Sequence, residues 1–429
     1  MRLAGLNFDR VPSLDVPFRF YLTAPFFAVL AGILLACFGT DIWASRWSPA
    51  AFAITHLLAL GVMAMIMFGS LFQLLPVLCG TPIRINAKLL TLFLISFSSG
   101  LLCLIAGFFQ LISYIASLVL LGTSLILFAT LLLTTLIRFA GGQFTRLPIL
   151  FAVISLMITL LMGITFLANF SWGFFGALPK YWTNIHASFG IFGWVTLLIV
   201  TISFQVIPMF HVTPEFPQKV RSYLPFLLFA SILLMSVEQI LWNSHFSFVI
   251  TWLLLASYSL FALKQLALRK RKLPDNTVRF WQFALANLIL STALMLVVNM
   301  FELPIDIEKN VGTLAAILLA LGCVLSVIQG MLLKIIPFLI TLHLQQHAMK
   351  YPMGMGLMPD HYSLIGRKQG THLWYLHIVT YILVISSIAY APILYLAGSV
   401  FTFSWGYLWW LLLSATKSYY EIRIAIENC

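Results

Sequence analysis

The stretch Leu71-Phe72-Gln73-Leu74-Leu75-Pro76 ends a long apolar run, and the same kind of phrase returns twice. It reads Ser203-Phe204-Gln205-Val206-Ile207-Pro208 in mid-chain and Leu332-Leu333-Lys334-Ile335-Ile336-Pro337 later. The separations, counted between the first residues, are 132 and 129. Spacing this even predicts a chain built from three related blocks. Because proline removes a backbone hydrogen bond, the phrase by itself is typical of a helix that bends or stops near a membrane surface.

The composition indicates a membrane protein. Of the 429 residues, 62% are hydrophobic and 8% are charged, and only a lipid bilayer can cover that much apolar surface. No apolar core with a cleavage site leads the chain, so we expect no removable signal peptide. We predict twelve membrane-spanning helices. Their approximate bounds are 19–40, 51–79, 88–108, 111–137, 147–170, 182–210, 222–242, 245–266, 279–301, 312–342, 371–391 and 393–416.

The distribution of positive charge predicts the orientation. If the N-terminus is cytoplasmic, all but three of the 24 Lys and Arg residues fall on the cytoplasmic side; the exceptions are Arg46, Lys180 and Lys309. Cytoplasmic loops of membrane proteins carry such an excess of cations. We therefore predict a multi-pass protein of the cell (inner) membrane with both termini in the cytoplasm. The net charge of +12 then reflects topology and gives no reason to expect nucleic acid as a partner.

The repeated phrase ends the second, sixth and tenth predicted spans. Each block then holds four helices, with the repeats at about 19–140, 147–270 and 276–416 of one transmembrane domain covering 1–429. The predicted fold is all-α, with twelve helices in three pseudo-symmetric four-helix arcs. We expect the blocks to superpose around an axis near the membrane normal.

Two of the three phrase-bearing helices carry a histidine. His56 lies twenty residues before Pro76 and His186 lies twenty-two residues before Pro208, which is about 30 Å along a helix in each case. Both are thus expected in the outer half of the membrane and facing the same interior space. Histidine inside a membrane helix is functional by default, and neutral imidazole is a common ligand of haem and metals. The alternative is an interfacial histidine hydrogen-bonded to a neighbour.

These residues also carry a resemblance. The stretch from His56 to Gly61 together with Phe72 to Pro76, and the opening Val16-Pro17-Phe18-Arg19, resemble the NnrS family and its scaffold relative, the catalytic subunit of haem–copper oxidases. The resemblance implies that His56 matches a low-spin haem ligand and that His186 matches a copper ligand. The histidine pairs that the oxidases carry on their seventh and tenth helices are absent here. We therefore expect no oxygen reductase activity.

The resemblance implies an integral membrane protein that binds haem or copper and acts in respiration, nitric-oxide tolerance or metal handling. A membrane transporter for a small solute or metal on the same scaffold is the alternative. A third possibility is a scaffold subunit without a cofactor; any protein partner stays unspecified. The three repeats argue against the major facilitator fold, which has two halves.

A second group of possible metal ligands lies on the inner side. His343 and His347 are four residues apart and so share a helix face, and thioether sulfur with imidazole suits copper. No compact ligand spacing appears, however, and methionine is also common at membrane interfaces. The remaining members are Met349, Met353, Met355, Met358, His361, His372 and His377.

The other polar residues of the helices have simpler interpretations. We predict helix-end roles for His211 and His245, and an ion pair between Glu238 and His245, with a proton or ion path through Glu238 as the alternative. The cysteines form no CxxC pair and are expected to pack as apolar residues. They are Cys37, Cys79, Cys103, Cys323 and Cys429.

Overall fold

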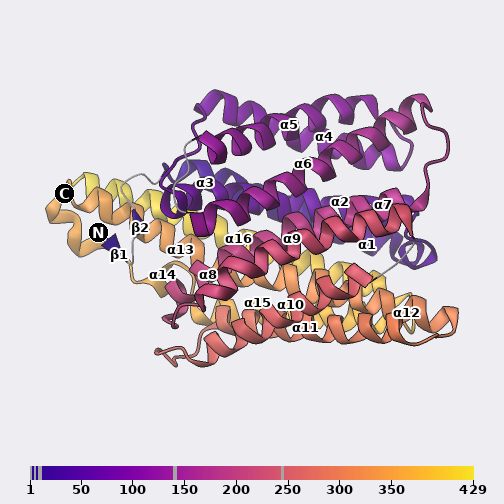
Figure 1. The fold of residues 1–429 in the computed structure, drawn as a ribbon. Helices are drawn as coiled ribbons and strands as arrows, with labels where there is room; N and C mark the ends of the chain where they lie inside the picture. Colours follow the sequence, from indigo (N-terminus) through magenta and orange to yellow (C-terminus); the bar gives the residue numbers. More distant parts are fainter. Residues whose placement is uncertain (1, 4–5, 8–11, 139–142, 243–245) are drawn as a thin grey trace. The chain divides into compact units, whose positions relative to one another are not determined.

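The computed structural model describes residues 2–3, 6–7, 12–138, 143–242 and 246–429, and Figure 1 shows their fold. Nearly all of these residues are helical, which confirms the all-α class. The strands of the described part are short: β1 (Arg2–Leu3) and β2 (Leu6–Asn7) pair antiparallel.

The helices follow the predicted spans closely. Several extend beyond the apolar run by a turn or more, because a helix can continue through polar residues once it leaves the hydrocarbon. The bounds are α1 Asp15–Ala44, α2 Pro49–His56, η1 Leu57–Ala64, α3 Met65–Cys79, α4 Ala87–Phe108, α5 Ile115–Arg138, α6 Gln143–Trp172, α7 Lys180–Ser188, η2 Phe189–Thr196, α8 Leu197–His211, α9 Gln218–Leu241, α10 Phe246–Ala267, α11 Asn276–Met300, α12 Ile305–Ile317, η3 Leu318–Leu325, α13 Ser326–Ala348, η4 Pro352–Leu357, α14 His361–Leu364, α15 Arg367–Ser386 and α16 Ile393–Glu427.

Eleven continuous helices of the described residues are long and apolar enough to cross a membrane. The predicted span 371–391 falls on α15, which is not among them. This helix begins with Arg367, Lys368 and Gln369 and also holds His372, so its mean hydropathy is low. The count of twelve spans stays a prediction, while the multi-pass membrane character is well supported.

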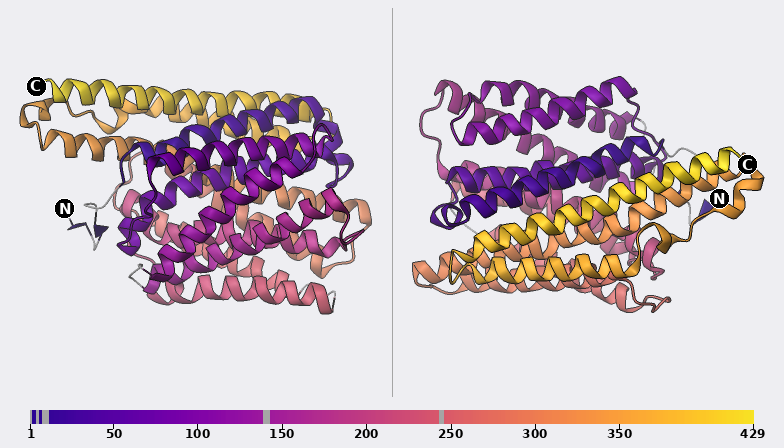
Figure 2. Two further views of the ribbon diagram at one scale, coloured as in Figure 1. Left: turned by 90° about the horizontal axis from the view of Figure 1, so that it is seen from above. Right: turned by 180° about the vertical axis from the view of Figure 1, so that it is seen from behind.

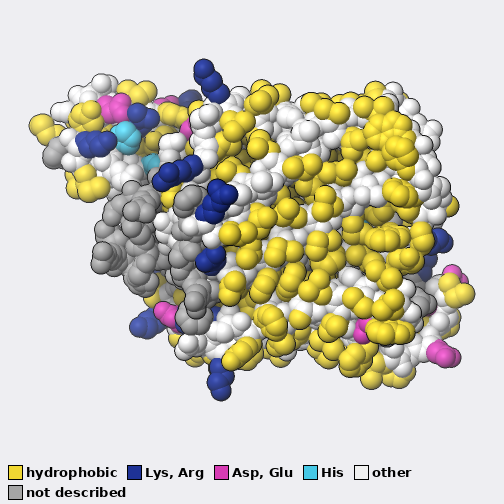
Figure 3. Space-filling model, turned by 45° about the horizontal axis from the view of Figure 1, so that its top comes forward, with side chains coloured by type: hydrophobic (Ala, Val, Ile, Leu, Met, Phe, Trp, Pro, Cys, Tyr) yellow, Lys and Arg dark blue, Asp and Glu magenta, His cyan; other side chains and the backbone are white. Residues whose placement is uncertain are grey.

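The surface matches a lipid environment. Large apolar side chains stand outward along the helices, for example Leu92 and Ile95 of α4, which are 62% and 61% exposed. The face shown in Figure 3 is covered mainly by such hydrophobic side chains. A water-soluble monomer rarely exposes so much contiguous apolar surface. The protein is therefore an integral membrane protein.

Three of the long helices contain an eight-residue π-helical segment, in which backbone bonds reach five residues back instead of four. The segments η1, η2 and η3 begin at Leu57, Phe189 and Leu318. Their separations are 132 and 129 residues, the same as those of the repeated phrase. The repeat is therefore visible in the backbone as well as in the sequence.

The bonding of these segments is also alike. Met65 after η1 donates its backbone N–H to the carbonyl of Leu60, and Leu197 after η2 donates to that of Phe192. Side-chain hydroxyls add bonds of the same reach: Thr196 Oγ1 lies 2.6 Å from the Ile191 carbonyl, and Ser326 Oγ lies 3.1 Å from that of Leu321.

The chain divides into two compact units by its internal contacts. The first contains the end of α3 from Ser70, α4 to α10, the part of α11 from Leu285 onward, and α12. Hydrogen bonds from side-chain hydroxyls join neighbouring helices of this unit. Ser96 Oγ of α4 donates to the Leu120 carbonyl of α5 at 2.9 Å, and Tyr258 of α10 donates to Ser203 Oγ of α8 at 2.8 Å.

The second unit contains α1, α2, all of η1, the start of α3 up to Gly69, the start of α11, and the chain from Ala320 in η3 to the end of α16. Helices α1 and α16 run antiparallel, side by side, in both views of Figure 2. Glycines line their contact: Gly32 faces Thr402, and Gly398 faces the backbone of Leu35 and Ala36. Membrane helices approach closely at such small residues because van der Waals packing, and no hydrophobic effect, drives their association.

Candidate functional site

His56 ends α2, directly before the π-helical segment η1. Its ring Nδ1 lies 2.8 Å from the backbone carbonyl of Phe52, one turn earlier. A carbonyl oxygen can only accept, so Nδ1 carries the hydrogen and Nε2 carries the lone pair. Metal-binding histidines commonly donate their second ring nitrogen to a carbonyl in this way, which fixes the ring and its tautomer. The half-buried side chain of His56 therefore fits the requirements of a haem or metal ligand.

His186 lies in α7, three residues before η2. Its ring packs in an edge-to-face arrangement with Phe166 of α6, at a centroid distance of 5.5 Å. Gly163, also on α6, leaves room beside it, since a Cβ there would lie 3.4 Å from His186 Cε1. The half-buried ring thus lies against α6.

The two histidines do not occupy equivalent positions of the repeat. With η1 aligned on η2, His56 corresponds to Ser188, and His186 corresponds to Ile54. An offset of two residues turns a side chain by about 200° around a helix axis. His56 and His186 also belong to different compact units. Their service of one shared space stays a prediction.

The third copy has no histidine before or within η3 on its own helix, but the neighbouring helix α15 supplies one. His377 of α15 is fully buried, and its Nε2 lies 2.6 Å from Ser326 Oγ, at the end of η3. The rings of Phe280 and Phe283 pack against it, with centroids 5.4 and 5.9 Å away. On the basis of the sequence we place His377 among the inner histidines. Its position within the predicted membrane span 371–391 is the signal that could have distinguished it from that group.

Gln329 lies one turn beyond Ser326 on α13 and is fully buried. Within the described residues neither its amide nitrogen nor its amide oxygen has a hydrogen-bond partner. An unpaired amide in a low-dielectric interior is unfavourable by about 1–3 kcal/mol. The interior of this copy is therefore more polar than its mostly apolar helix suggests. The polar side chains are those of Ser326, Gln329 and His377.

The inner histidines do not form a single site. His343 is buried on α13, His347 Nδ1 lies 3.5 Å from Glu427 Oε1, and His372 is exposed on α15. Ser326, the partner of His377, precedes His343 by seventeen residues, or about 25 Å of helix. In the part of the chain that the structure describes, no three His, Cys, Asp or Glu side chains gather as a metal-binding group. Metal binding at His343, His347 or His372 stays a prediction.

The methionines of this region are also spread out. Met349, Met353 and Met355 are exposed around the short helix η4, and Met358 is half-buried. The side chain of His361 lies outside the part that the structure describes.

Glu238 has a structural partner. Its two carboxylate oxygens accept from the backbone N–H and the hydroxyl of Ser247, both at 2.9 Å, in the first turn of α10. A carboxylate at a helix N-terminus is stabilising, which accounts for an acid at this position. His245 lies outside the described residues. His211 is buried in the last turn of α8, as expected for a helix end.

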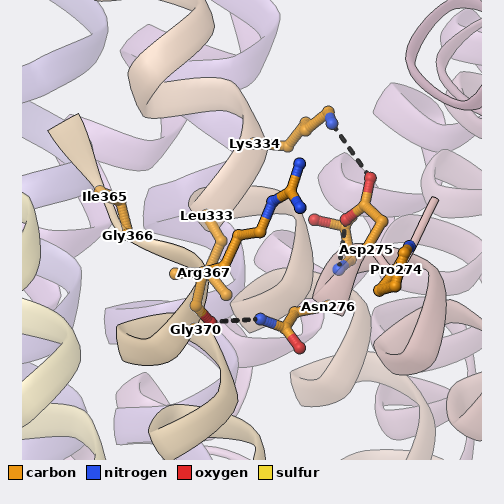
Figure 4. Close-up of a pocket in the computed structure, with 10 residues that line it drawn as sticks. Pro274, Asp275, Asn276, Leu333, Lys334, Ile365, Gly366, Arg367 and Gly370 are labelled. Carbon is orange, nitrogen blue, oxygen red and sulfur yellow. Dashed lines mark hydrogen bonds and ion pairs between the residues drawn. The ribbon is translucent and has the colours of Figure 1, made fainter. Parts of the chain in front are cut away.

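Lys334 takes the place of Gln73 and Gln205 in the third phrase. Its Nζ lies 3.0 Å from Asp275 Oδ2, and the two side chains are 18% and 20% exposed. This ion pair borders a small pocket built by the loop before α11, by α13 and by the start of α15 (Figure 4). The lysine could be identified in the sequence, but its partner, which is 59 residues away, could not.

The chain was compared with models of protein families and with curated protein sequences, and neither comparison finds a match.

Proposed function

We propose that this integral membrane protein binds a haem or a copper ion through His56, with His186 as the second candidate ligand. In this proposal the chain belongs with the scaffold of haem–copper oxidases and of the NnrS family but lacks the oxygen-reducing centre. Its role lies in respiration, nitric-oxide tolerance or metal handling.

The bond from His56 Nδ1 to the Phe52 carbonyl is the observation that carries the proposal. It orients the imidazole and places the lone pair on Nε2, the atom that a metal requires. The adjoining π-helical segment adds support, because such segments occur often at functional sites. A haem or copper ion would supply one-electron chemistry, which side chains alone do not provide.

An absorbance spectrum of the purified protein tests the haem form of the proposal. We expect a Soret band in the wild type and its loss in His56→Ala. His245→Ala is the matched control, because the sequence gives His245 a helix-end role, and it should leave the band unchanged. Copper, measured by elemental analysis of the same preparations, tests the other form. If the wild type carries neither group, or if His56→Ala retains it fully, the proposal fails.

We further propose that the protein lies in the cell (inner) membrane with both termini in the cytoplasm. The cation bias supports this orientation. A single cysteine at Lys270, an exposed loop position, in a cysteine-free background should react with a membrane-impermeant maleimide only after the cells are opened. Labelling of intact cells contradicts the orientation.

A transporter on the same scaffold is the second candidate. The three interrupted helices favour it, because transporters place their substrate sites at interruptions of membrane helices. Uptake of a solute or metal by vesicles that contain the protein, unchanged in His56→Ala, would select this function over the first.

A further inference from the structure

The pocket beside Lys334 is positively charged. Two cations, Lys334 and Arg367, and one acid, Asp275, line it, so its formal net charge is +1. In Figure 4 the side chains of Arg367, Lys334 and Asp275 point toward one another across the opening. Lys334 is ion-paired with Asp275, and Arg367, at the start of α15, brings a second cation to the same pocket.

Two helices begin at this pocket and add to its positive potential. Helix α11 starts at Asn276 and α15 starts at Arg367, and the first backbone N–H groups of a helix carry partial positive charge. Asp275 Oδ1 accepts from the Thr277 N–H at 2.9 Å and so satisfies one of those groups. A negatively charged group in the pocket is therefore stabilised by both side chains and backbone.

The wall of the pocket is fixed by specific contacts. Asn276 Nδ2 donates to the Arg367 carbonyl at 2.9 Å, and its Oδ1 accepts from Thr371 Oγ1 at 3.3 Å. Gly370 makes this possible, because a Cβ there would lie 2.7 Å from Asn276 Nδ2. The start of α11 is thus tied to the start of α15 and holds Arg367 at the opening.

The charge is particular to the third copy of the repeat. The equivalent positions of the first and second copies hold Gln73 and Gln205, which are neutral. A lysine is therefore not needed to end a helix of this type. The end of the helix therefore does not account for Lys334, whose charge lies at the pocket beside Asp275.

We propose that this pocket binds the phosphate group of a singly charged phosphodiester, held by Arg367 and Lys334. Arginine and lysine form strong charge-assisted hydrogen bonds with phosphate oxygens. The net charge of +1 favours one negative charge over the two of a phosphate monoester. A phospholipid headgroup and a soluble phosphodiester share this chemistry.

The experiment measures the thermal unfolding midpoint of the full chain in detergent against two probes. One is phosphatidylglycerol, compared in the same micelles with diacylglycerol, which lacks the phosphodiester. The other is the water-soluble glycerophosphoglycerol, compared with chloride at equal ionic strength. A rise of the midpoint with the lipid alone identifies the headgroup as the ligand, and a rise with both identifies the phosphodiester itself. No rise with either probe refutes the proposal.

Variants show whether the pocket is responsible. Arg367→Gln and Lys334→Gln should each raise the apparent dissociation constant about tenfold, the effect of losing one charge-assisted hydrogen bond. Lys368→Gln is the matched control, since Lys368 is the adjacent exposed cation and does not line the pocket. Asp275→Asn removes the repelling carboxylate and should tighten binding. Equal responses of Arg367→Gln and Lys368→Gln contradict the proposal, because general charge then explains the binding.

Discussion

The helix that holds His56 and the helix that holds Lys334 have the same interruption but different polar residues. Both contain a π-helical segment, η1 in the first and η3 in the third copy. Each segment begins fourteen residues before the repeated phrase. The first has His56 directly before the segment, where the third has Ile317. The first has Gln73 in the phrase, where the third has Lys334. The backbone geometry therefore repeats between the two copies, whereas the polar side chains at equivalent positions differ.

The two copies also share a close helix contact. Gly69 of the first copy lies against Phe20 of α1, with a Cβ built there at 2.8 Å from the Phe20 Cβ. Gly330, at the equivalent position of the third, would meet the Phe280 Cβ of α11 at 2.5 Å. The second copy has Thr201 at this position. The first and third copies therefore share a close helix contact at a glycine, where a larger side chain would not fit.

The largest expected effect comes from breaking this shared packing. Gly330→Leu forces a side chain against Phe280, and overpacking of this kind lowers the free energy of unfolding by about 3 kcal/mol. Unfolding by sodium dodecyl sulfate titration measures the change. Gly406→Leu is the control, because nothing lies within 4 Å of a Cβ there, and an equal loss in both variants would contradict the packing argument.

The ion pair of the third copy gives the next effect. Lys334→Gln restores the residue of the other copies but leaves Asp275 without its cation, which should lower the free energy of unfolding by about 2 kcal/mol. Adding Asp275→Asn should recover most of that loss. A double-mutant cycle gives the coupling energy, and a coupling near zero would mean that the pair adds no stability.

The buried histidine of the third copy gives a smaller effect. Ser326→Ala removes the hydroxyl that faces His377 Nε2 and should lower the free energy of unfolding by about 1–1.5 kcal/mol. The matched control is Ser257→Ala, whose hydroxyl bonds its own helix at the Leu253 carbonyl. Similar small losses in both variants would show that His377 does not depend on Ser326.

The smallest expected effect is at the helix starts. Ser48 caps α2 by accepting from the Ala51 N–H at 3.1 Å, whereas Pro304 before α12 makes no such bond and Asp306 and Glu308 supply negative charge instead. Ser48→Ala should lower the free energy of unfolding by roughly 0.5–1 kcal/mol, and Asp306→Asn by a few tenths. Thermal unfolding of both variants checks this order, and the reverse order would contradict it.

Much of the fold could be predicted because apolar runs and short loops determine where membrane helices lie. The span 312–342 lies inside the continuous helix Ile305–Ala348, and only its polar ends were missed. The π-helical segments could not be predicted, since their residues are as apolar as an ordinary helix. The partners Ser326–His377 and Lys334–Asp275 were missed because each joins helices far apart in sequence, and periodicity carries no information about such contacts.

The π-helical segments also bear on how the length of this chain can change. A backbone bond that spans five residues takes in one residue more than an α-helical bond. Deleting one residue between Leu57 and Ala64 is therefore absorbed when the segment returns to α-helix, and Gln73 and Pro76 keep their faces. The same deletion after Met65, where the helix is already α-helical, would turn every later residue by about 100°. For this helix a deletion within η1 is therefore less damaging than a deletion within α3.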